Sequence, residues 1–443
     1  MFTFAAHSTY QSLIHQSSIK LKLRQRRKIV RYLNILDQPI QPSPLVFSRT
    51  FLLWALVGLV GGIIAGLYWI GLDFLMHFFG YFKGWQVIPL MATTGLLAGL
   101  VIHFIGDPGE LNLIVNNIRF NKGKLDPKNN PSMIVSSLLC VASGGSLGPE
   151  APLVQVTGST GSWIGKLFRL KGEELRSLSI AGMASGFTAL FGAPLGGSLF
   201  ALEVLHYEYA ALYYQAIIPA FVASCFSYLI FALIMHLGVG PIWNFSAYTF
   251  SGIFDFGYAV LFAIVGAAIG WVFILVTKFL KNNFEKKPIP IYIKTCIGGL
   301  LLGIIAYYLP LTRYFGHHEI NELISEKFTL QLLVAILIFK IIAIAISVTS
   351  GWRGGFIIPL FFVGATLGLI IHQLFPGTNL LLAMVSCMAA VNACVTRTPM
   401  STTILLATLT GFGQFIPIFF ASLTGYFLAP KIPFITSQME QEE

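Results

Sequence analysis

The chain has 443 residues, of which 56% are hydrophobic and 10% are charged, with a formal net charge of +10. About a quarter of the residues of an ordinary soluble domain are charged. The composition therefore excludes a soluble globular protein and predicts an all-α polytopic membrane protein. The five cysteines lie in or beside apolar stretches without metal-ligand spacing, so we expect neither a metal site nor a cofactor.

The amino-terminal segment, residues 1–48, is basic. Seven lysines and arginines and no acid lie between Lys20 and Arg31. Cytoplasmic segments beside membrane helices are enriched in these residues, so we expect a cytoplasmic amino terminus. A nucleic-acid-binding patch is the alternative, and we expect no nucleic-acid partner. Residues 1–16 lack the pattern of a cleavable signal peptide.

Apolar runs follow in chain order and predict membrane helices, because a helix needs about 20 apolar residues to cross a bilayer. The longer runs are residues 52–74, 87–105, 211–237, 258–276, 295–309, 330–348 and 415–428. The runs 133–142, 154–164 and 195–205 are too short to span alone. Irregular backbone at membrane depth is tolerated only around a cavity or against protein. Short helices that meet inside the bilayer are therefore expected.

Two glycine-rich breaks divide the apolar pattern in a similar way. They read SGGSLGPEAPLVQVTGSTG at residues 143–161 and SGWRGGFIIPLFFVGATLG at residues 350–368. Paired interruptions in two halves of a transporter indicate a binding site between repeats. We expect a first membrane repeat at 49–237 and a second at 238–435, followed by a short tail at 436–443. Chance similarity between two glycine-rich helix starts is the alternative.

The physical chemistry of these breaks favours an anion. A helix amino end presents unpaired N–H groups and about half a positive charge, so two converging ends can replace the water around an anion. The first break carries one carboxylate, Glu150, in nearly charge-free surroundings. An acid is costly there unless function retains it. Glu150 is thus predicted to compete with the anion and to carry a proton.

The break motifs also resemble those of a known family. GPEAPLVQ, residues 148–155, looks like the gating-glutamate motif of the voltage-gated chloride channel family, and GGFIIP, residues 354–359, resembles its second anion-binding motif. Residues 168–204 are also similar in order and spacing. The resemblance covers residues 50–435 and implies chloride channels or chloride/proton antiporters with an inverted-repeat fold, whose broken helices meet at mid-membrane.

The same resemblance implies a homodimer in the plasma (inner) membrane, with chloride or another small anion, and protons, as transported partners. The tail after Phe434 is too short for the nucleotide-sensing domains that some members carry. Fluoride selectivity is a minor alternative, because the chain shows no clear match to that branch of the family.

The resemblance assigns individual residues. Glu150 matches the gating glutamate, and the backbone N–H groups of Phe356 and Ile357 match those that hold the central anion. Phe434 stands where the family usually has an anion-contacting tyrosine, and Gly109 lies near the position of an anion-contacting serine. The remaining residues assigned to anion binding are Gly148 and Ala151. Two hydroxyl donors are therefore expected to be missing, and Pro149 removes one N–H.

The proton route also departs from the family pattern. Exchangers often carry two consecutive glutamates at its cytoplasmic end, but this chain has Glu203 followed by Val204. Loss of ligands loosens anion binding and favours fast passage, so the sequence favours channel-like or weakly proton-coupled conduction. A chloride/proton antiporter with a substitute acid is the alternative. Glu203 is interpreted as a helix cap, with proton passage as its alternative role.

Other ionisable residues have structural explanations first. Lys340 and Arg397 lie in apolar surroundings, where each either raises the positive potential of the route or pairs with carbonyls. His103 and Asp107 lie near the imperfect first motif and are candidates for titration in the vestibule. The sequence contains no nucleophile elbow, HExxH motif or paired intramembrane carboxylates, so a membrane-embedded enzyme is a remote alternative.

Overall fold

The fold is known from a computed structural model, which describes residues 48–109, 111–206, 210–236, 241–243, 245, 252–285 and 288–439. The basic cluster at residues 20–31 lies outside these ranges, as does the boundary between the two expected repeats at 237/238. The chain divides into residues 1–48 and a compact unit that begins at Arg49. The helices and the site belong to the unit that begins at Arg49.

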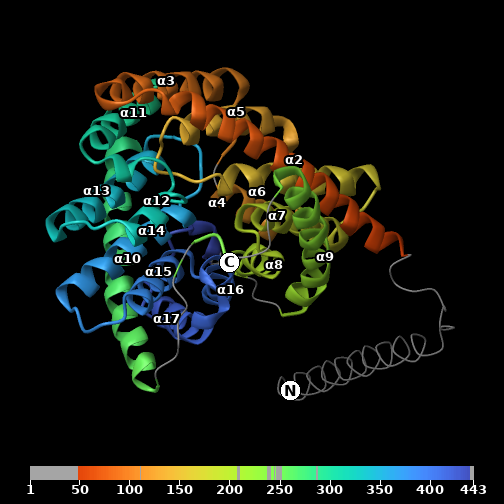
Figure 1. Cartoon of the computed structure of the whole chain (residues 1–443). Coiled ribbons are helices and arrows are strands. Elements are labelled where there is room, and N and C mark those ends of the chain that lie inside the picture. The colour runs from red at the N-terminus through yellow and green to blue at the C-terminus, as the bar shows by residue number, and fades with distance from the viewer. Residues whose placement is uncertain are drawn as a thin grey trace, which may run out of the picture. The chain divides into compact units, whose positions relative to one another are not determined.

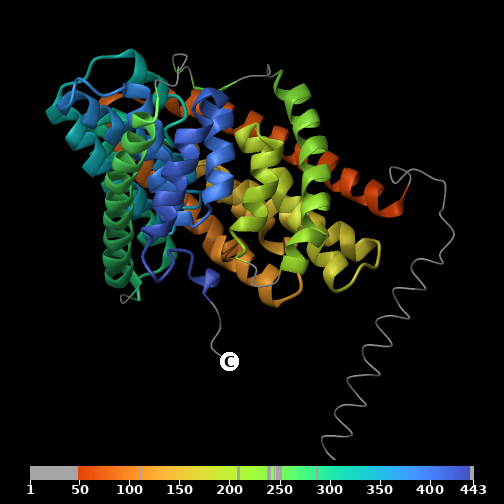
Figure 2. The same ribbon diagram turned by 90° about the horizontal axis from the view of Figure 1, so that it is seen from below.

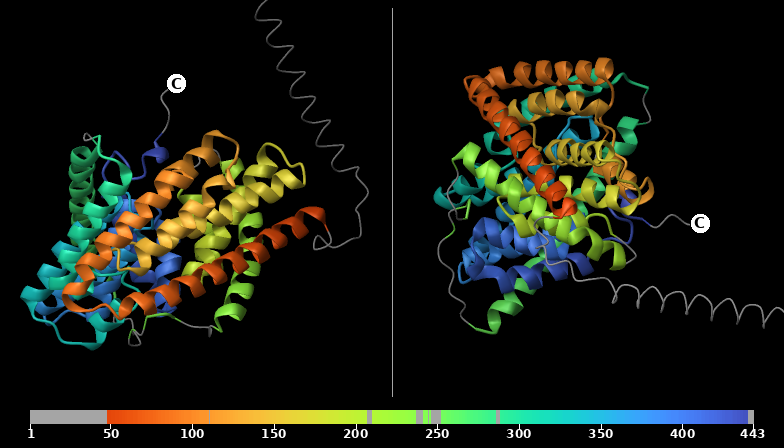
Figure 3. Two further views of the ribbon diagram at one scale, coloured as in Figure 1. Left: turned by 90° about the horizontal axis from the view of Figure 1, so that it is seen from above. Right: turned by 90° about the vertical axis from the view of Figure 1, so that its right-hand side faces the viewer.

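The described residues of the first half of the compact unit form eight α-helices. They are α2 (Arg49–Gly80), α3 (Val87–Ile105), α4 (Leu111–Phe120), α5 (Asn130–Ala142), α6 (Glu150–Leu167), α7 (Glu173–Phe191), α8 (Pro194–Glu203) and α9 (Ala210–Met235). Figure 1 shows them in red to yellow-green, and the left-hand view of Figure 3 shows α2 as a long slanted rod.

In the second half, the part of the chain that the structure describes forms eight more α-helices. They are α10 (Phe254–Glu285), α11 (Ile291–Tyr308), α12 (Glu319–Ser325), α13 (Leu330–Thr349), α14 (Ile357–Leu374), α15 (Leu380–Thr396), α16 (Pro399–Thr410) and α17 (Phe415–Phe427). A short 3-10 turn, η6 (Thr436–Gln438), follows. In Figure 2 the blue helices α15 to α17 lie between α10 on one side and α8 and α9 on the other.

Seven helices in the described part of the chain are long and apolar enough to cross a membrane. Each long run predicted from the sequence falls on a helix, although α2 and α10 have 32 residues each and extend well beyond their apolar runs. The run 415–428 was predicted to be a membrane helix, but α17 has only 13 residues and is not one of the seven; α14 is one of them and was not among the predicted runs. The runs also did not include α4 and α12, and they did not reveal α7, α15 and α16. Glycine, serine, threonine and alanine interrupt their apolar pattern, yet nearly every residue of α7 and α15 is buried by neighbouring helices.

The helices pair in the same order in the two halves. In the first half α2 packs on α9, α6 on α7, α3 on α5 and α8 on α9. In the second half the corresponding pairs are α10 with α17, α14 with α15, α11 with α13 and α16 with α17. The halves also touch each other through equivalent helices, α3 with α11 and α8 with α16. This repetition favours duplication of one helical unit over a chance similarity of two glycine-rich breaks.

Candidate anion site

The two glycine-rich breaks lie against each other. The N–H of Gly148 donates to the carbonyl of Gly355 at 2.7 Å, and the N–H of Gly355 donates back to the carbonyl of Gly148 at 2.6 Å. The helices α6 and α14 begin two residues after this bridge, at Glu150 and Ile357. The expectation that two helix amino ends converge on one place is thus confirmed.

Glu150 occupies the point of convergence. Its side chain is buried, with 1% of the residue exposed. The Oε1 atom accepts a hydrogen bond of 2.8 Å from the N–H of Ile358, in the first turn of α14. The Oε2 atom is buried and has no hydrogen-bond partner among the described residues. A carboxylate here takes the place of an anion at a helix amino end, where orphan N–H groups and the helix dipole favour negative charge.

Glycine is required on both sides of this carboxylate. A Cβ atom at Gly148 would lie 2.6 Å from Cδ of Glu150, and a Cβ atom at Gly355 would lie 2.6 Å from Cβ of Glu150. Both hypothetical atoms would also overlap Oε2. Any larger residue at either position therefore requires the carboxylate to move, which explains the glycines of the two breaks better than backbone flexibility does.

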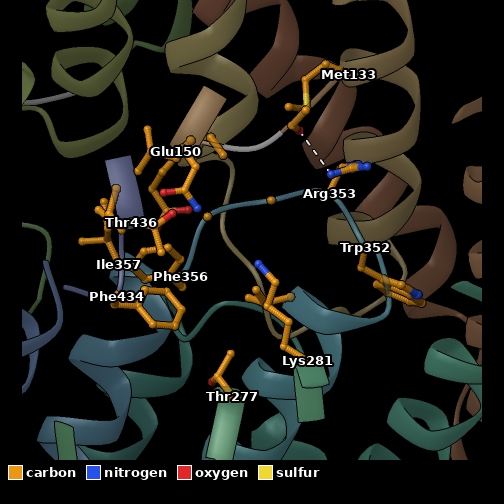
Figure 4. Close-up of a pocket in the computed structure, with 18 of the residues that line it drawn as sticks. Met133, Glu150, Thr277, Lys281, Trp352, Arg353, Phe356, Ile357, Phe434 and Thr436 are labelled. Atoms are coloured by element: carbon orange, nitrogen blue, oxygen red, sulfur yellow. Dashed lines mark hydrogen bonds between the residues drawn. The ribbon is translucent and has the colours of Figure 1, made fainter. Parts of the chain in front are cut away.

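A cavity of about 130 Å³ adjoins Glu150 (Figure 4). Since one water occupies about 30 Å³ of liquid, this space accommodates a small hydrated anion. Its wall comes from both breaks, α10, the start of α4 and the segment before η6. The lining residues include the carboxylate of Glu150, three cations and two residues without a side-chain donor: Glu150, Lys278, Lys281, Arg353, Gly109 and Phe434.

The structure brings most of the predicted site residues to this cavity. Ala151, Phe356, Ile357, Phe434 and Gly109 line it together with Glu150. Gly148 does not line the cavity, but it forms the bridge to Gly355 that seats Glu150. Their roles in anion binding remain predictions.

An aromatic wall closes one side of the cavity. The rings of Phe356 and Phe434 meet edge to face at 5.1 Å, and Phe273 packs on Phe434 at 5.3 Å. The aromatic surface expected at Phe434 is therefore present without a hydroxyl group.

Sequence analysis missed a buried cation in the second break. The Arg353 side chain is 6% exposed, and its Nη2 donates to Oδ1 of Asp107 at 2.8 Å. Its Nη1 donates to the carbonyl of Gly109 at 3.2 Å. The signal was visible, since a cation inside a glycine-rich break is unusual in an apolar chain. Lys281 of α10 was also missed as a cavity residue.

The two candidates for titration separate in the structure. Asp107 joins the site through Arg353. His103 lies exposed on α3, where its ring contacts Phe104 and Tyr292, and it does not line the cavity.

Glu203 lies at another helix start. Its Oε1 accepts from the N–H of Met400 at 3.0 Å, and its Oε2 accepts from the N–H and the hydroxyl of Ser401, each at 2.7 Å. These contacts make Glu203 a cap of α16. The next residue, Val204, is fully buried, and its carbonyl accepts from the Gln438 amide at 3.2 Å.

The two remaining cations of interest pair with carbonyls. The buried Lys340 ammonium donates to the carbonyls of Thr312 and Tyr314 at 3.2 and 2.7 Å. Arg397 donates to the carbonyls of Pro430 and Lys431. Both are hydrogen-bonded locally, which the fully buried Lys340 requires.

Similar proteins show the same fold. An uncharacterized protein of Methanocaldococcus jannaschii, MJ0305, is 29% identical over 84% of this chain and 91% of its own length. A chloride/fluoride channel protein of Pseudomonas syringae pv. tomato is 28% identical over 82% of this chain and 80% of its own. The crystal structure of a CLC-type fluoride/proton antiporter superposes with a TM-score of 0.79 at 21% identity, covering 90% of this chain and 99% of that one.

The sequence pattern of the voltage gated chloride channel family matches residues 95–430. That range contains both breaks, Glu150 and the helices α4 to α17 in full. The multi-span all-α fold agrees with the family, whose members transport anions. This chain belongs to the voltage gated chloride channel family.

Proposed function

We propose that this protein conducts chloride across the membrane through the cavity beside Glu150, and that the Glu150 carboxylate gates the pathway. The observation that carries the proposal is the position of that carboxylate on the first turn of α14, with Ile358 as its donor. An anion that needs the same N–H groups competes with Glu150. Since protonation removes the negative charge of the carboxyl group, lower pH weakens this competition and should open the path.

The proposed pathway is channel-like or weakly coupled to protons. The residue after Glu203 is Val204, which is fully buried and cannot bind a proton. Glu203 itself is held by Met400 and Ser401 at the start of α16. A chloride/proton antiporter needs another group to take up the proton on this side. Both a channel and an antiporter occur among the similar proteins, so the measurement of coupling has to be made on this chain.

The protein is further proposed to act as a homodimer in the plasma membrane, with residues 1–48 on the cytoplasmic side. The basic cluster at residues 20–31 supports this orientation. The repeated helix pairing described above supports the two membrane repeats at 49–237 and 238–435. Accessibility of a cysteine introduced at residue 20 to an impermeant reagent tests the orientation, because a cytoplasmic site reacts only after the cells are opened.

The test of function is chloride efflux from liposomes that hold the purified protein, with external pH recorded at the same time. Chloride efflux without proton movement supports the channel-like proposal. Protons driven uphill by a chloride gradient would support the antiporter instead. Absence of flux for chloride and for the other halides would contradict chloride transport.

The variant Glu150→Gln tests the gate within the same assay. The amide keeps the size of the side chain but cannot ionise, so it should resemble the protonated gate. Chloride efflux is expected to become constitutive and independent of pH. Efflux of this variant with the pH dependence of the unmodified protein would contradict the assignment of Glu150 as the gate.

A further inference from the structure

The wall of the cavity is cationic. Among the described residues that line it, three carry positive charge, Lys278, Lys281 and Arg353, and the acid is Glu150. Figure 4 shows the Lys281 side chain directed from α10 toward the segment that carries Arg353, and the Arg353 side chain directed toward Met133. Cations that line a narrow, low-dielectric space concentrate anions within it.

Arg353 is held in a fixed place in this wall. It precedes the Gly354–Gly355 pair, which leads directly into α14. Its bonds to Asp107 and to the Gly109 carbonyl tie the second break to the segment between α3 and α4. The guanidinium group stays charged at any physiological pH and has five N–H donors in a rigid plane. A fixed cation with several donors is suited to binding an anion.

Two residues that line the cavity together with Arg353, Gly109 and Phe434, offer no side-chain donor. Thr277 and Thr436, which carry hydroxyl groups, line it as well. The Gly109 carbonyl accepts from Nη1 of Arg353, so the guanidinium group lies beside a position of the wall that has no side-chain donor of its own.

We propose that Arg353 is an anion ligand of the pathway and that Asp107 is its internal counter-anion, which competes with the transported anion for the guanidinium group. This inference rests on the proposed chloride transport through the same cavity and names the group that binds the anion there. Lys281 adds positive potential to the same space.

The two partners of the ion pair differ in exposure, and the difference supports competition. The Asp107 side chain is 67% exposed, whereas that of Arg353 is 6% exposed. An exposed carboxylate is well solvated when it releases its partner, so the release costs Asp107 little. A buried cation left without a counter-charge is costly. A mobile anion in the cavity can therefore replace Asp107, which returns to water.

The test is the dissociation constant of chloride, measured by calorimetry on the purified full chain in detergent. Arg353→Gln should weaken chloride binding by about tenfold or more, the loss expected for a hydrogen bond to a charged group. Asp107→Asn should tighten binding by roughly threefold, because it removes the competing charge while keeping an oxygen at that position. The double variant should bind as weakly as Arg353→Gln, since Asp107 acts only through Arg353.

Two further variants separate ligand from scaffold. Arg353→Lys keeps the positive charge and should therefore retain part of the chloride affinity. If Arg353 only braced the structure, chloride affinity would not depend on its charge. Lys124→Gln removes an exposed cation outside this cavity and serves as the control for net charge, with unchanged binding expected. Should Arg353→Gln fail to fold, Asp107→Asn and Arg353→Lys carry the test.

Unchanged chloride affinity in Asp107→Asn together with unchanged affinity in Arg353→Lys or Arg353→Gln would overturn the inference. That result is distinguishable from failure of the proposed function. If the unmodified protein moves no chloride in liposomes, the proposed function fails; if it moves chloride but these variants bind it equally well, only the role of Arg353 and Asp107 fails.

Discussion

Two carboxylates of this protein, the buried Glu150 and the half-buried Glu203, each lie on the amino end of a helix, but they are held very differently. Glu150 on α14 accepts one hydrogen bond, from Ile358, and its second oxygen has no partner among the described residues. Glu203 on α16 accepts three, and both of its oxygens are used. The same arrangement of an acid on a helix start is thus loosely held in one place and fully satisfied in the other.

The difference separates a movable acid from a fixed one. A buried oxygen without a partner forfeits its hydration and gains nothing in return, which costs about 1–3 kcal/mol. Glu150 would give up one hydrogen bond when it leaves α14, and an adjoining cavity gives it space. Glu203 would lose three bonds and uncover the α16 start. One geometry is suited to a gate and the other to a cap.

Gly355→Ala is expected to have the largest effect on this contrast. The new Cβ atom would lie 2.6 Å from Cβ of Glu150 and would overlap Oε2. Overpacking costs about 1–3 kcal/mol, which corresponds to an approximately 5- to 150-fold shift in population. The shift disfavours the seated carboxylate, so chloride efflux from liposomes should rise and lose pH dependence, as in Glu150→Gln.

The matched control is Gly257→Ala on α10, where no atom lies within 4 Å of the added carbon. Its efflux should equal that of the unmodified protein. Lower efflux in Gly355→Ala, with the protein still folded by gel filtration, would mean that the carboxylate does not block the path from its seat on α14.

Glu203→Ala should alter stability more than transport. It leaves the N–H groups of Met400 and Ser401 at the α16 start without their acceptor, and loss of the acceptor that caps a helix start costs about 0.5–2 kcal/mol. The apparent Tm of the purified protein should therefore fall, while chloride efflux per folded molecule and its pH dependence stay unchanged. Thermal unfolding followed by gel filtration measures the first quantity.

The conservative variant Glu203→Gln sharpens this test. The amide oxygen still accepts a hydrogen bond from the α16 start, so most of the stability should return. If instead the unmodified protein moves protons and Glu203→Gln stops them at normal stability, Glu203 belongs to a proton route and the comparison between gate and cap fails.

Much of the fold could be predicted from the sequence because its signals are local. A break rich in glycine and proline between apolar runs indicates a helix start, and α6 and α14 do begin within the two breaks, at Glu150 and Ile357. Helices such as α7 and α15 escaped because their small and polar residues are explained only by neighbours that bury them.

The ion pair between Arg353 and Asp107 is a different kind of omission. It joins residues 246 positions apart, and no periodicity relates them. The hydrogen bond that Glu150 accepts from Ile358 likewise depends on the side-chain position within the closed site. Contacts between single side chains that are far apart in the sequence are seen only in the packed structure, whereas helix starts can be predicted from the local sequence.

Phe434→Tyr should have the smallest effect and bears on how firmly an anion competes with Glu150. Phe434 lines the cavity and packs edge to face on Phe356, so a tyrosine would add a hydroxyl donor to an existing wall without changing its shape. The hydroxyl would donate to a charged group, and the lower end of the usual range for such a hydrogen bond is about 1.5 kcal/mol, which corresponds to chloride binding tighter by about tenfold. Calorimetry in the Glu150→Gln background measures this gain without competition from the carboxylate.

Tighter binding should also slow efflux, because an ion that is held more firmly leaves more slowly. Weaker binding in Phe434→Tyr would show that the ring does not face the anion, and that the loosely held Glu150 competes for a site formed by the helix starts and Arg353 alone.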